Sequence, residues 1–338
     1  MPSPKFNFSE YTIGWICALT LEYETACAML DREFVGPSSL PPDDMNTYTY
    51  GQIGPHKIII GCLPEGIYGI ERASRVAKTM TRTFPQLKFA LVVGIGGGVP
   101  TRQHDIRLGD IVVGKPSRGF GGLLHYELID DRGATGPVTP RSNVRSIRHT
   151  SYHNAPPEVV QHGLAEMQRR YSDPRYPDMI AENVKRFSNR PGFHRPAVDL
   201  LYESNHEHQS GKTCSGCGQS KLVRRPARQS NSNRAVVVHY GTIASGNRVM
   251  KNGLVRDKFA QDRNSNIMCF EMEAAGLMNN LPCLVVRGIC DYSDTHKNDA
   301  WQGYASLTGA AYARELLMVI SHQRVQATPP WSVALNRV

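Results

Sequence analysis

Hydrophobic and polar positions follow two different periods along the first third of the chain. Residues 11–19 are almost continuously apolar, which is typical of a strand that is buried on both faces. From Thr20 onward, Ala26, Met29 and Leu30 recur at a spacing of three to four residues, which predicts a helix with Thr20 as its N-cap. The same two patterns predict a hairpin over 48–63, a helix over 67–84, and strands over 89–95 and 111–113.

A regular pattern returns in the last third. Residues 235–240 and 284–289 are apolar runs that predict buried strands. Residues 306–320 predict a helix, with Leu307, Ala310 and Leu317 among its apolar positions. Because strands and helices alternate along the chain, the sequence predicts an α/β fold.

The segment between about residues 130 and 234 breaks this pattern. Pro, Ser, Arg and Asn are frequent there, and only residues 157–171 predict a helix. Such a composition is typical of a long insertion, with 189–233 as its mobile part. We therefore interpret residues 1–322 as one domain with an insertion at about 130–234. Residues 323–338 contain two prolines and no periodic pattern, which indicates a tail or linker.

The net charge of +9 is concentrated in this insertion. Residues 141–234 contain 16 Lys and Arg against 8 Asp and Glu, so most of the positive excess lies there. A basic patch can attract nucleic acid, a membrane surface or the phosphate groups of a substrate. The aromatic residues of the segment are scattered and no nucleic-acid-binding motif is present. A solvated surface or a phosphorylated substrate is therefore favoured over nucleic acid.

The cysteines and the N-terminal residues indicate a cytoplasmic protein without a membrane segment. The first ten residues are polar, and no apolar run approaches the roughly 20 residues that a membrane helix needs. Five of the eight cysteines lie inside apolar strand or helix patterns, which favours buried free thiols in a reducing compartment.

One cysteine pair has the spacing of a metal motif. Cys214 and Cys217 form a single C-x-x-C pair, with His206 and His208 just upstream. A zinc site is chemically possible with these residue types, but the second half of a zinc motif is missing. A flexible loop is the favoured interpretation, so neither a metal nor a cofactor is predicted.

Two acidic patterns and a glycine run carry the candidate chemistry. Residues 283–290 are apolar and end at Asp291, and ligands of α/β folds bind outside the carboxyl ends of the strands. Glu271 and Glu273 flank Met272 at the start of a helical pattern. Residues 91–99 run from apolar residues into glycines, whose backbone can approach a ligand closely. This run is neither a dinucleotide fingerprint nor a P-loop.

Taken in this order, the motifs resemble those of the nucleoside phosphorylase and nucleosidase superfamily. The resemblance covers about residues 11–127 and 240–320. It is closest to the phosphorylase-like domains of fungal multidomain proteins of the immune-receptor type, a wider family that includes ATP nucleosidases. It implies a three-layer α/β/α domain with a central mixed, twisted sheet, assembled as a homo-oligomer.

The resemblance also implies roles for individual residues. Residues 13–22 are similar to the start of methylthioadenosine/adenosylhomocysteine nucleosidases, whose water-activating glutamate falls on Glu22. Asp291 would protonate the leaving purine, provided that burial raises its pKa. Glu273 would hold the ribose hydroxyls and Met272 would pack beneath the ring. The other implied substrate-binding positions are Glu271, Gly94, Ile95, Gly96, Ser245, Val249 and Met250.

The nucleophile separates two possible reactions. A phosphorylase needs cationic and hydroxyl groups to hold phosphate. The Arg and Ser of bacterial-type purine phosphorylases correspond here to Val92 and Ile95, which cannot bind an anion. Glu22 would repel phosphate but could activate water. The sequence therefore favours hydrolysis of the N-ribosidic bond of a purine nucleoside or nucleotide, with ATP or another adenine nucleotide as a candidate.

Two alternatives stay open at this point. One is a purine nucleoside phosphorylase that uses inorganic phosphate. The other is a catalytically inactive nucleotide-binding module of a signalling protein. Neither nucleic acid nor a membrane is expected as a partner.

Overall fold

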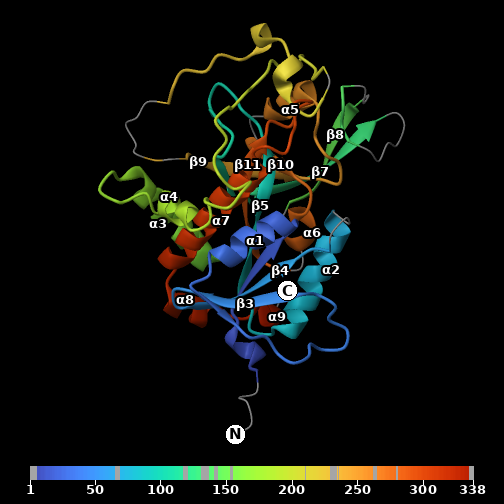
Figure 1. Cartoon of the computed structure of the whole chain (residues 1–338). Coiled ribbons are helices and arrows are strands. Elements are labelled where there is room, and N and C mark those ends of the chain that lie inside the picture. Colours follow the sequence, from blue (N-terminus) through green and yellow to red (C-terminus); the bar gives the residue numbers. More distant parts are fainter. Residues whose placement is uncertain are drawn as a thin grey trace.

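The fold is organised around one mixed β-sheet (Figure 1). A computed structural model describes residues 6–64, 69–116, 121–130, 137–140, 144–152, 155–209, 211–228, 234, 236–261, 265–278 and 281–334. In this part of the chain the sheet has 11 strands in the order β2-β3-β4-β1-β5-β11-β6-β9-β7-β8, and β10 pairs with both β5 and β9. The strands are β1 (Ile13–Cys17), β2 (Arg32–Phe34), β3 (Tyr48–Ile53), β4 (His56–Cys62), β5 (Phe89–Gly98), β6 (Ile111–Gly114), β7 (Leu123–Asp130), β8 (Val144–Tyr152), β9 (Val238–Ser245), β10 (Ile267–Glu271) and β11 (Cys283–Asp291).

The centre of the sheet is parallel and buried. Strands β4, β1, β5 and β11 run side by side in the same direction. Every residue of β1 and β11 is buried, which is why these strands appear in the sequence as continuous apolar runs. Strand β6 then pairs antiparallel with β11, so the sheet is mixed, as predicted.

Helices cover this sheet in two groups (Figure 1). Helix α7 packs on β5 and β11 and also contacts α1, α3 and α4, whereas α2 packs against α6 and α9. The predicted α/β fold is therefore confirmed. The helices are α1 (Thr20–Ala28), α2 (Ile70–Thr83), α3 (Glu158–Ser172), α4 (Met179–Lys185), α5 (Gly253–Ala260), α6 (Ala274–Met278), α7 (Gln302–Val319), α8 (His322–Ala327) and α9 (Trp331–Ala334), with 3-10 turns at Phe8–Glu10, Cys214–Gly216 and Gln219–Lys221.

Local boundaries differ from the predictions at the two ends of the chain. The N-cap of α1 is Leu19 and not Thr20, because the Glu22 carboxylate accepts the Leu19 backbone N–H. The segment from residue 323 was predicted to lack a pattern, but α8 and α9 lie there and Val325 is fully buried. The predicted helix over 67–84 is α2, which begins at Ile70; residues 65–68 lie outside the described part.

The predicted insertion divides into two parts. Its first described helix, α3, confirms the helix predicted over 157–171, and it packs on α7 with Val160, Leu164 and Met167 buried in the main core. Helix α4 also packs on α7, so both helices belong to the helical layer. The described residues from 189 to 228 contain short 3-10 turns and cross the upper end of the molecule near α5 (Figure 1).

Candidate active site

A cavity of about 280 Å³ opens at the carboxyl ends of β5 and β11. Strand β10 crosses there, pairing antiparallel with the glycine end of β5. Of the predicted site residues, eight line this cavity, and the structure brings them together from four separate stretches of chain. These are Glu22, Ile95, Gly96, Val249, Met250, Glu271, Met272 and Glu273.

Glu22 lies at the wall of this cavity, and both oxygens of its carboxylate accept backbone hydrogen bonds. Its Oε2 atom accepts the backbone N–H groups of Ala18 (2.7 Å) and Leu19 (3.1 Å), and Oε1 accepts that of Ile95 (2.8 Å). The side chain is buried, and burial raises the pKa of Glu22 although Arg287 and the three N–H donors oppose the shift. A carboxylate with a raised pKa is a better base toward a bound water.

The position of the glutamate side chains at this wall depends on a residue that was not among the predicted site residues. Arg287 lies in the middle of β11, and its side chain is only 1% exposed. Its Nη2 atom donates to the Glu271 carboxylate and lies 3.5 Å from Glu273 Oε2. An arginine inside an apolar strand needs a carboxylate partner, so its presence in the run 283–290 was the available signal.

Glycine at position 94 makes this arrangement possible. A Cβ atom there would clash with Glu22 Oε1 and with Arg287 Nη1. Gly94 therefore stands behind the cavity wall, where it lets Glu22 and Arg287 approach over the backbone of β5. Three carboxylates thus surround one guanidinium, an arrangement that would repel an anion but can hold a water or a hydroxyl group.

Glu273 has the most exposed carboxylate of the three, with a side chain that is 12% exposed. Burial raises its pKa to about 8; Arg287 opposes this shift, while the neighbouring Glu271 and Glu22 add to it. Glu271 is bound more completely, because it also accepts the backbone N–H groups of Glu273 and Ala274 at the start of α6. Of these two carboxylates, Glu273 is therefore the one that can still accept hydrogen bonds from a ligand.

Asp291 differs from the prediction that burial raises its pKa. The carboxylate is buried, which alone would raise the pKa, but Lys297 Nζ donates to Oδ2 at 2.7 Å. The Ser293 backbone N–H also donates to Oδ1 at 2.8 Å. Together these donors hold the pKa of Asp291 below its usual value. The predicted raised pKa is therefore wrong, because the loop after β11 brings a cation onto the carboxylate.

Asp291 lies at the border between the cavity and a larger hollow of about 780 Å³. It lines the larger hollow, while Cys290 and Lys297 line both spaces. A Cβ atom at Gly97 would clash with Ser293 Oγ and would lie 2.7 Å from Asp291 Oδ1, so the glycine end of β5 admits both side chains. Ser293 has a φ of 56°, a strained conformation of the kind found at functional sites.

One predicted site residue has a structural contact instead. Ser245 ends β9 and is fully buried, and its Oγ atom accepts the backbone N–H of Ala275 at 3.0 Å. Ser245 does not line the cavity; it holds α6, whose first turn follows Glu273. It therefore positions the glutamate segment.

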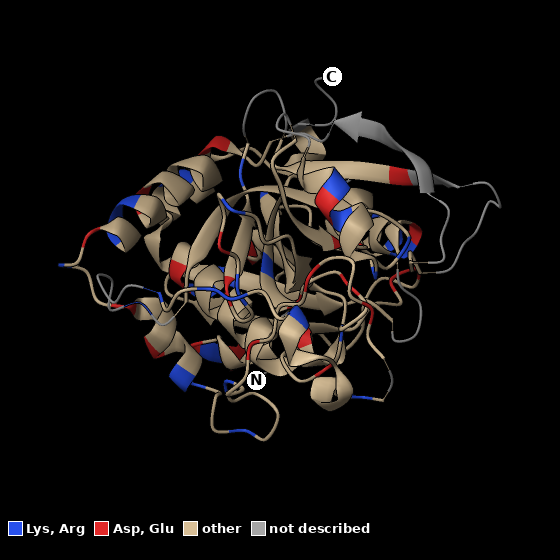
Figure 2. Ribbon diagram, turned by 90° about the horizontal axis from the view of Figure 1, so that it is seen from above, with Lys and Arg blue, Asp and Glu red and all other residues tan. Residues whose placement is uncertain are grey.

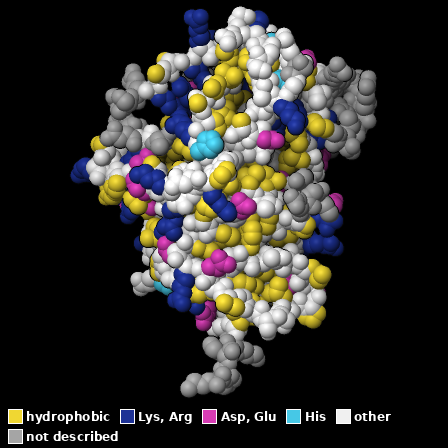
Figure 3. Space-filling view, viewed as in Figure 1, with side chains coloured by type: hydrophobic (Ala, Val, Ile, Leu, Met, Phe, Trp, Pro, Cys, Tyr) yellow, Lys and Arg dark blue, Asp and Glu magenta, His cyan; other side chains and the backbone are white. Residues whose placement is uncertain are grey.

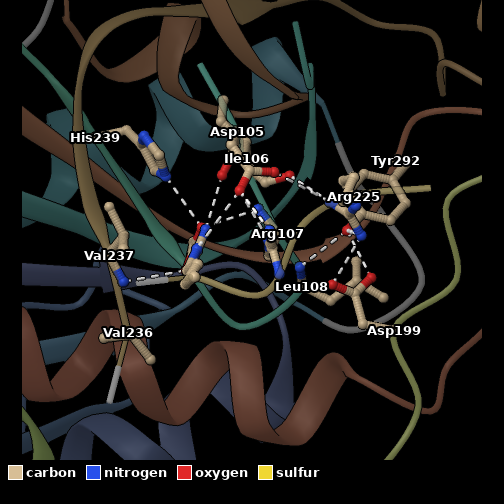
Figure 4. A network of polar contacts seen from close by, with 12 residues as sticks. Asp105, Ile106, Arg107, Leu108, Asp199, Arg225, Val236, Val237, His239 and Tyr292 are labelled. Carbon is tan, nitrogen blue, oxygen red and sulfur yellow. Dashed lines mark hydrogen bonds and ion pairs between the residues drawn. The ribbon is translucent and has the colours of Figure 1, made fainter. Parts of the chain in front are cut away.

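Some basic side chains of the insertion form ion pairs with acidic side chains of the protein. Arg225 Nη2 donates to Asp199 Oδ2 at 2.9 Å, and Arg228 forms an ion pair with the buried Asp110 just before β6 (Figure 4). The Tyr292 hydroxyl joins this network through Asp199 Oδ1 at 2.6 Å. Seen from above, Lys and Arg lie among Asp and Glu along the loops at this end (Figure 2). These two arginines are thus occupied by the protein's own carboxylates.

Other basic residues lie near the two spaces. Arg248 lines the cavity, and Lys212 and Lys251 line the larger hollow. In the space-filling view, Lys and Arg side chains gather at the upper end of the molecule (Figure 3). A ligand that carries negative charge would meet these groups on leaving the cavity.

Solved structures with the same fold are nucleosidases. The futalosine hydrolase of Helicobacter pylori aligns with a TM-score of 0.52 at 15% identity, covering 92% of this chain and 99% of that one. The 5′-methylthioadenosine/S-adenosylhomocysteine nucleosidase of Neisseria meningitidis, solved with methylthio-immucillin-A, aligns with a TM-score of 0.52 at 13% identity, covering 90% and 98%. The chain therefore has the fold of these nucleosidases. The resemblance stated from the motifs is confirmed.

The sequence relatives of the chain are longer proteins. The chain is 37% identical over 325 residues to a nucleotide-binding leucine-rich repeat (NLR)-like protein of Hyaloscypha variabilis, covering 96% of this chain and 31% of that protein. It is 31% identical over 87 residues to the ATP nucleosidase Cap17 of Escherichia coli, covering 24% and 17%. The chain thus spans less than a third of the length of these relatives. No protein-family model matches it.

Among the described helices, none has the length and apolarity to cross a bilayer.

Proposed function

We propose that this domain hydrolyses the N-ribosidic bond of a purine nucleoside or nucleotide and releases the free base. The observation that carries this proposal is the group of Glu22, Glu271 and Glu273 around the buried Arg287, at the wall of a cavity of nucleoside size. The nucleosidase fold supports it. A cytoplasmic location and a homo-oligomer stay predictions from the sequence.

In this proposal, water attacks C1′ of the ribose while the bond to purine N9 breaks. Glu22 Oε1 accepts one N–H and retains capacity to accept a proton from water. Arg287 Nε is buried and has no hydrogen-bond partner among the described residues. This nitrogen does not line the cavity, so the attacking water is assigned to Glu22, which removes its proton.

The leaving purine needs a proton, which we assign to the Asp291–Lys297 pair. Lys297 Nζ donates to Asp291 Oδ2 at 2.7 Å and passes its ammonium proton to that oxygen. Asp291 delivers this proton to N7 of the base as the N9 bond breaks, which leaves the Asp291 carboxylate beside a neutral Lys297 amine until the amine takes up a proton from solvent. The role of Asp291 as the acid is thus kept, but its proton comes through Lys297 and not from a raised pKa.

Glu273 would hold the ribose hydroxyls and stabilise the positive charge that develops on the sugar, as in glycoside hydrolysis. Since the ionised form does this work, and its pKa is raised to about 8, we expect kcat/KM to rise with pH between about 7 and 9. The pH profiles of wild type and of Glu273→Gln test this. The variant should lose both activity and the ionisation near pH 8. A wild-type kcat/KM that falls over this interval would contradict the role.

A more specific form of the proposal is that the substrate is a phosphorylated adenine compound such as ATP. It is supported by the partial similarity to an ATP nucleosidase and by the adjoining hollow, into which a 5′ chain could extend past Lys212 and Lys251. Attraction between these lysines and a triphosphate would weaken as salt is added.

A substrate panel tests the proposal. Adenosine, inosine, methylthioadenosine and ATP are incubated with the purified chain, with and without inorganic phosphate, and the products are separated by chromatography. We expect the free base together with ribose from adenosine and inosine, 5-methylthioribose from methylthioadenosine, and ribose 5-triphosphate from ATP, without any need for phosphate. We also expect kcat/KM for ATP to exceed that for adenosine at low salt, with an advantage that shrinks at high salt.

The two alternatives give different products in the same panel. Release that requires phosphate and yields ribose 1-phosphate would establish phosphorolysis. Nucleotide binding without base release would establish an inactive module. Equal efficiency on ATP and adenosine at all salt concentrations would leave base release intact but remove the nucleotide preference.

The water-activating role is tested by Glu22→Gln. We expect kcat to fall by about a hundredfold with little change in substrate Kd, because an amide is a poor base. Glu24→Gln on the same helix is the control, since Glu24 lies outside the cavity. Thermal unfolding of both variants checks that the loss is chemical, because Glu22 also organises the start of α1. A variant that releases base at the normal rate would exclude Glu22 as the base.

A further inference from the structure

Two overlapping groups of metal-ligand side chains meet at Cys217, beside the larger hollow. One group is Cys214, Cys217 and His208, and the other is Cys217, His206 and His296. Within each group the ligand atoms lie within 4.8 Å of one another. His296 comes from the loop after β11, far along the chain from the C-x-x-C pair. The fold therefore supplies the second half that the zinc motif lacks in the sequence.

The hydrogen bonds of His208 leave one ring nitrogen unprotonated and able to bind a metal. Its Nε2 atom lies 3.0 Å from the carbonyl oxygen of Gly211, so the proton belongs on Nε2. The unprotonated Nδ1 atom then faces Cys217 Sγ at 3.2 Å. Metal-bound histidines typically donate their other N–H in this way, and nitrogen and sulfur ligands of tetrahedral zinc lie about 3.5 Å apart.

The imidazole of His296 is buried near Asp294, whose Oδ1 atom lies 3.6 Å from Nδ1, beyond hydrogen-bond distance. The ring is buried and stacks on Tyr202 with centroids 4.0 Å apart. Neither of its nitrogens has a hydrogen-bond partner among the described residues, and the same holds for the buried Nε2 atom of His206. Buried polar atoms without a partner are rare in folded proteins and call for a ligand.

We propose that Cys214, Cys217 and His208 bind a structural Zn²⁺ ion, and that His296, which approaches Cys217 from the second group, moves in as the fourth ligand. Two sulfur and two nitrogen ligands match the tetrahedral preference of zinc, and four protein ligands leave no open position for catalysis. Binding replaces the thiol protons, and both protons leave to solvent as the two thiolates bind the ion. His206 stands beside the site and is the competing fourth ligand.

The ion would fix the position of the catalytic loop. His296 precedes Lys297, whose ammonium group pairs with Asp291. On the other side, the His208 backbone N–H donates to Thr295 Oγ1 at 2.8 Å. The zinc would therefore tie the insertion to the segment that carries Lys297. This consequence rests on the proposed function, whereas the metal site itself does not.

Metal content tests the site directly. The chain is purified under reducing conditions without chelators, and zinc is measured by inductively coupled plasma mass spectrometry. We expect about one zinc per chain. Cys217→Ser and His296→Ala should lose most of it, while Cys27→Ser and His162→Ala, which change residues outside the cluster, should keep it. Replacement of zinc by cobalt should give the ligand-field and thiolate bands of a tetrahedral site, a readout that needs no variant.

The outcomes separate the assignments. A folded, reduced wild-type chain that carries no zinc and binds neither zinc nor cobalt overturns the proposal, and so does a Cys214–Cys217 disulfide that persists in the chain purified under reducing conditions. If His206→Ala loses zinc and His296→Ala keeps it, the assignment of His296 is wrong. Because zinc content does not depend on turnover, an inactive chain that still binds one zinc would sink the proposed function and leave the metal site standing.

Discussion

Replacing Asp291 with Asn is expected to slow base release by about 10²- to 10⁴-fold, the usual effect of losing a general acid. The amide keeps the shape of the side chain, but its single oxygen can replace only one of the two acceptors that Ser293 and Lys297 now use. It cannot pass a proton to the purine. Product release is measured by chromatography at saturating substrate, and the thermal unfolding temperature is measured on the same sample.

A matched control lies outside both spaces. Asp43 is exposed and forms an ion pair with Arg82, and Asp43→Asn should leave kcat within about twofold because surface changes of this kind have small effects. Lys297→Met should lower activity as well, since it removes the ammonium group that supplies the proton. Near-normal turnover in Asp291→Asn would remove the residue from the mechanism.

Replacing Arg287 with Met is expected to lower the free energy of unfolding by about 3–5 kcal/mol at neutral pH. Removal of one partner from a buried ion pair leaves an uncompensated charge, and here it leaves Glu271 and Glu273 facing each other. Urea unfolding followed by circular dichroism measures the loss. Arg82→Met is the control, because Arg82 forms an exposed ion pair with Asp43 and should cost no more than about 1 kcal/mol.

The loss in Arg287→Met should depend on pH in a defined direction. The folded pKa of Glu273 is raised from 4.5 to about 8, so the native state holds a proton that the unfolded state releases between these values. The stability that this proton provides is fully present below pH 4.5 and is lost as pH rises toward 8. Without the guanidinium the folded pKa rises further, so the deficit of the variant should grow between about pH 7 and pH 9, where Glu273 ionises in the wild type and stays protonated in the variant. A deficit that shrinks over this interval would contradict the carboxylate cluster.

The sequence by itself determined the architecture and the composition of the site. The runs that became β1, β5 and β11 can be recognised because strands buried on both faces are largely apolar, and α7 can be recognised from its helical period. Eight of the cavity residues, including Glu22 and Glu273, were expected from the resemblance of the motifs to those of the nucleosidase superfamily.

Only the tertiary structure decided the electrostatics of these groups. A pKa depends on which charges stand within a few ångströms, and those charges come from other segments. Lys297 lowers the pKa of Asp291 through a turn at Ser293, and Arg287 is shared with glutamates from α1 and the β10–α6 junction. In the same way, His296 reaches the Cys217 pair only because the insertion folds over the end of β11. The local sequence pattern indicates which side chains lie at the site, whereas packing between distant segments determines their protonation states and their partners.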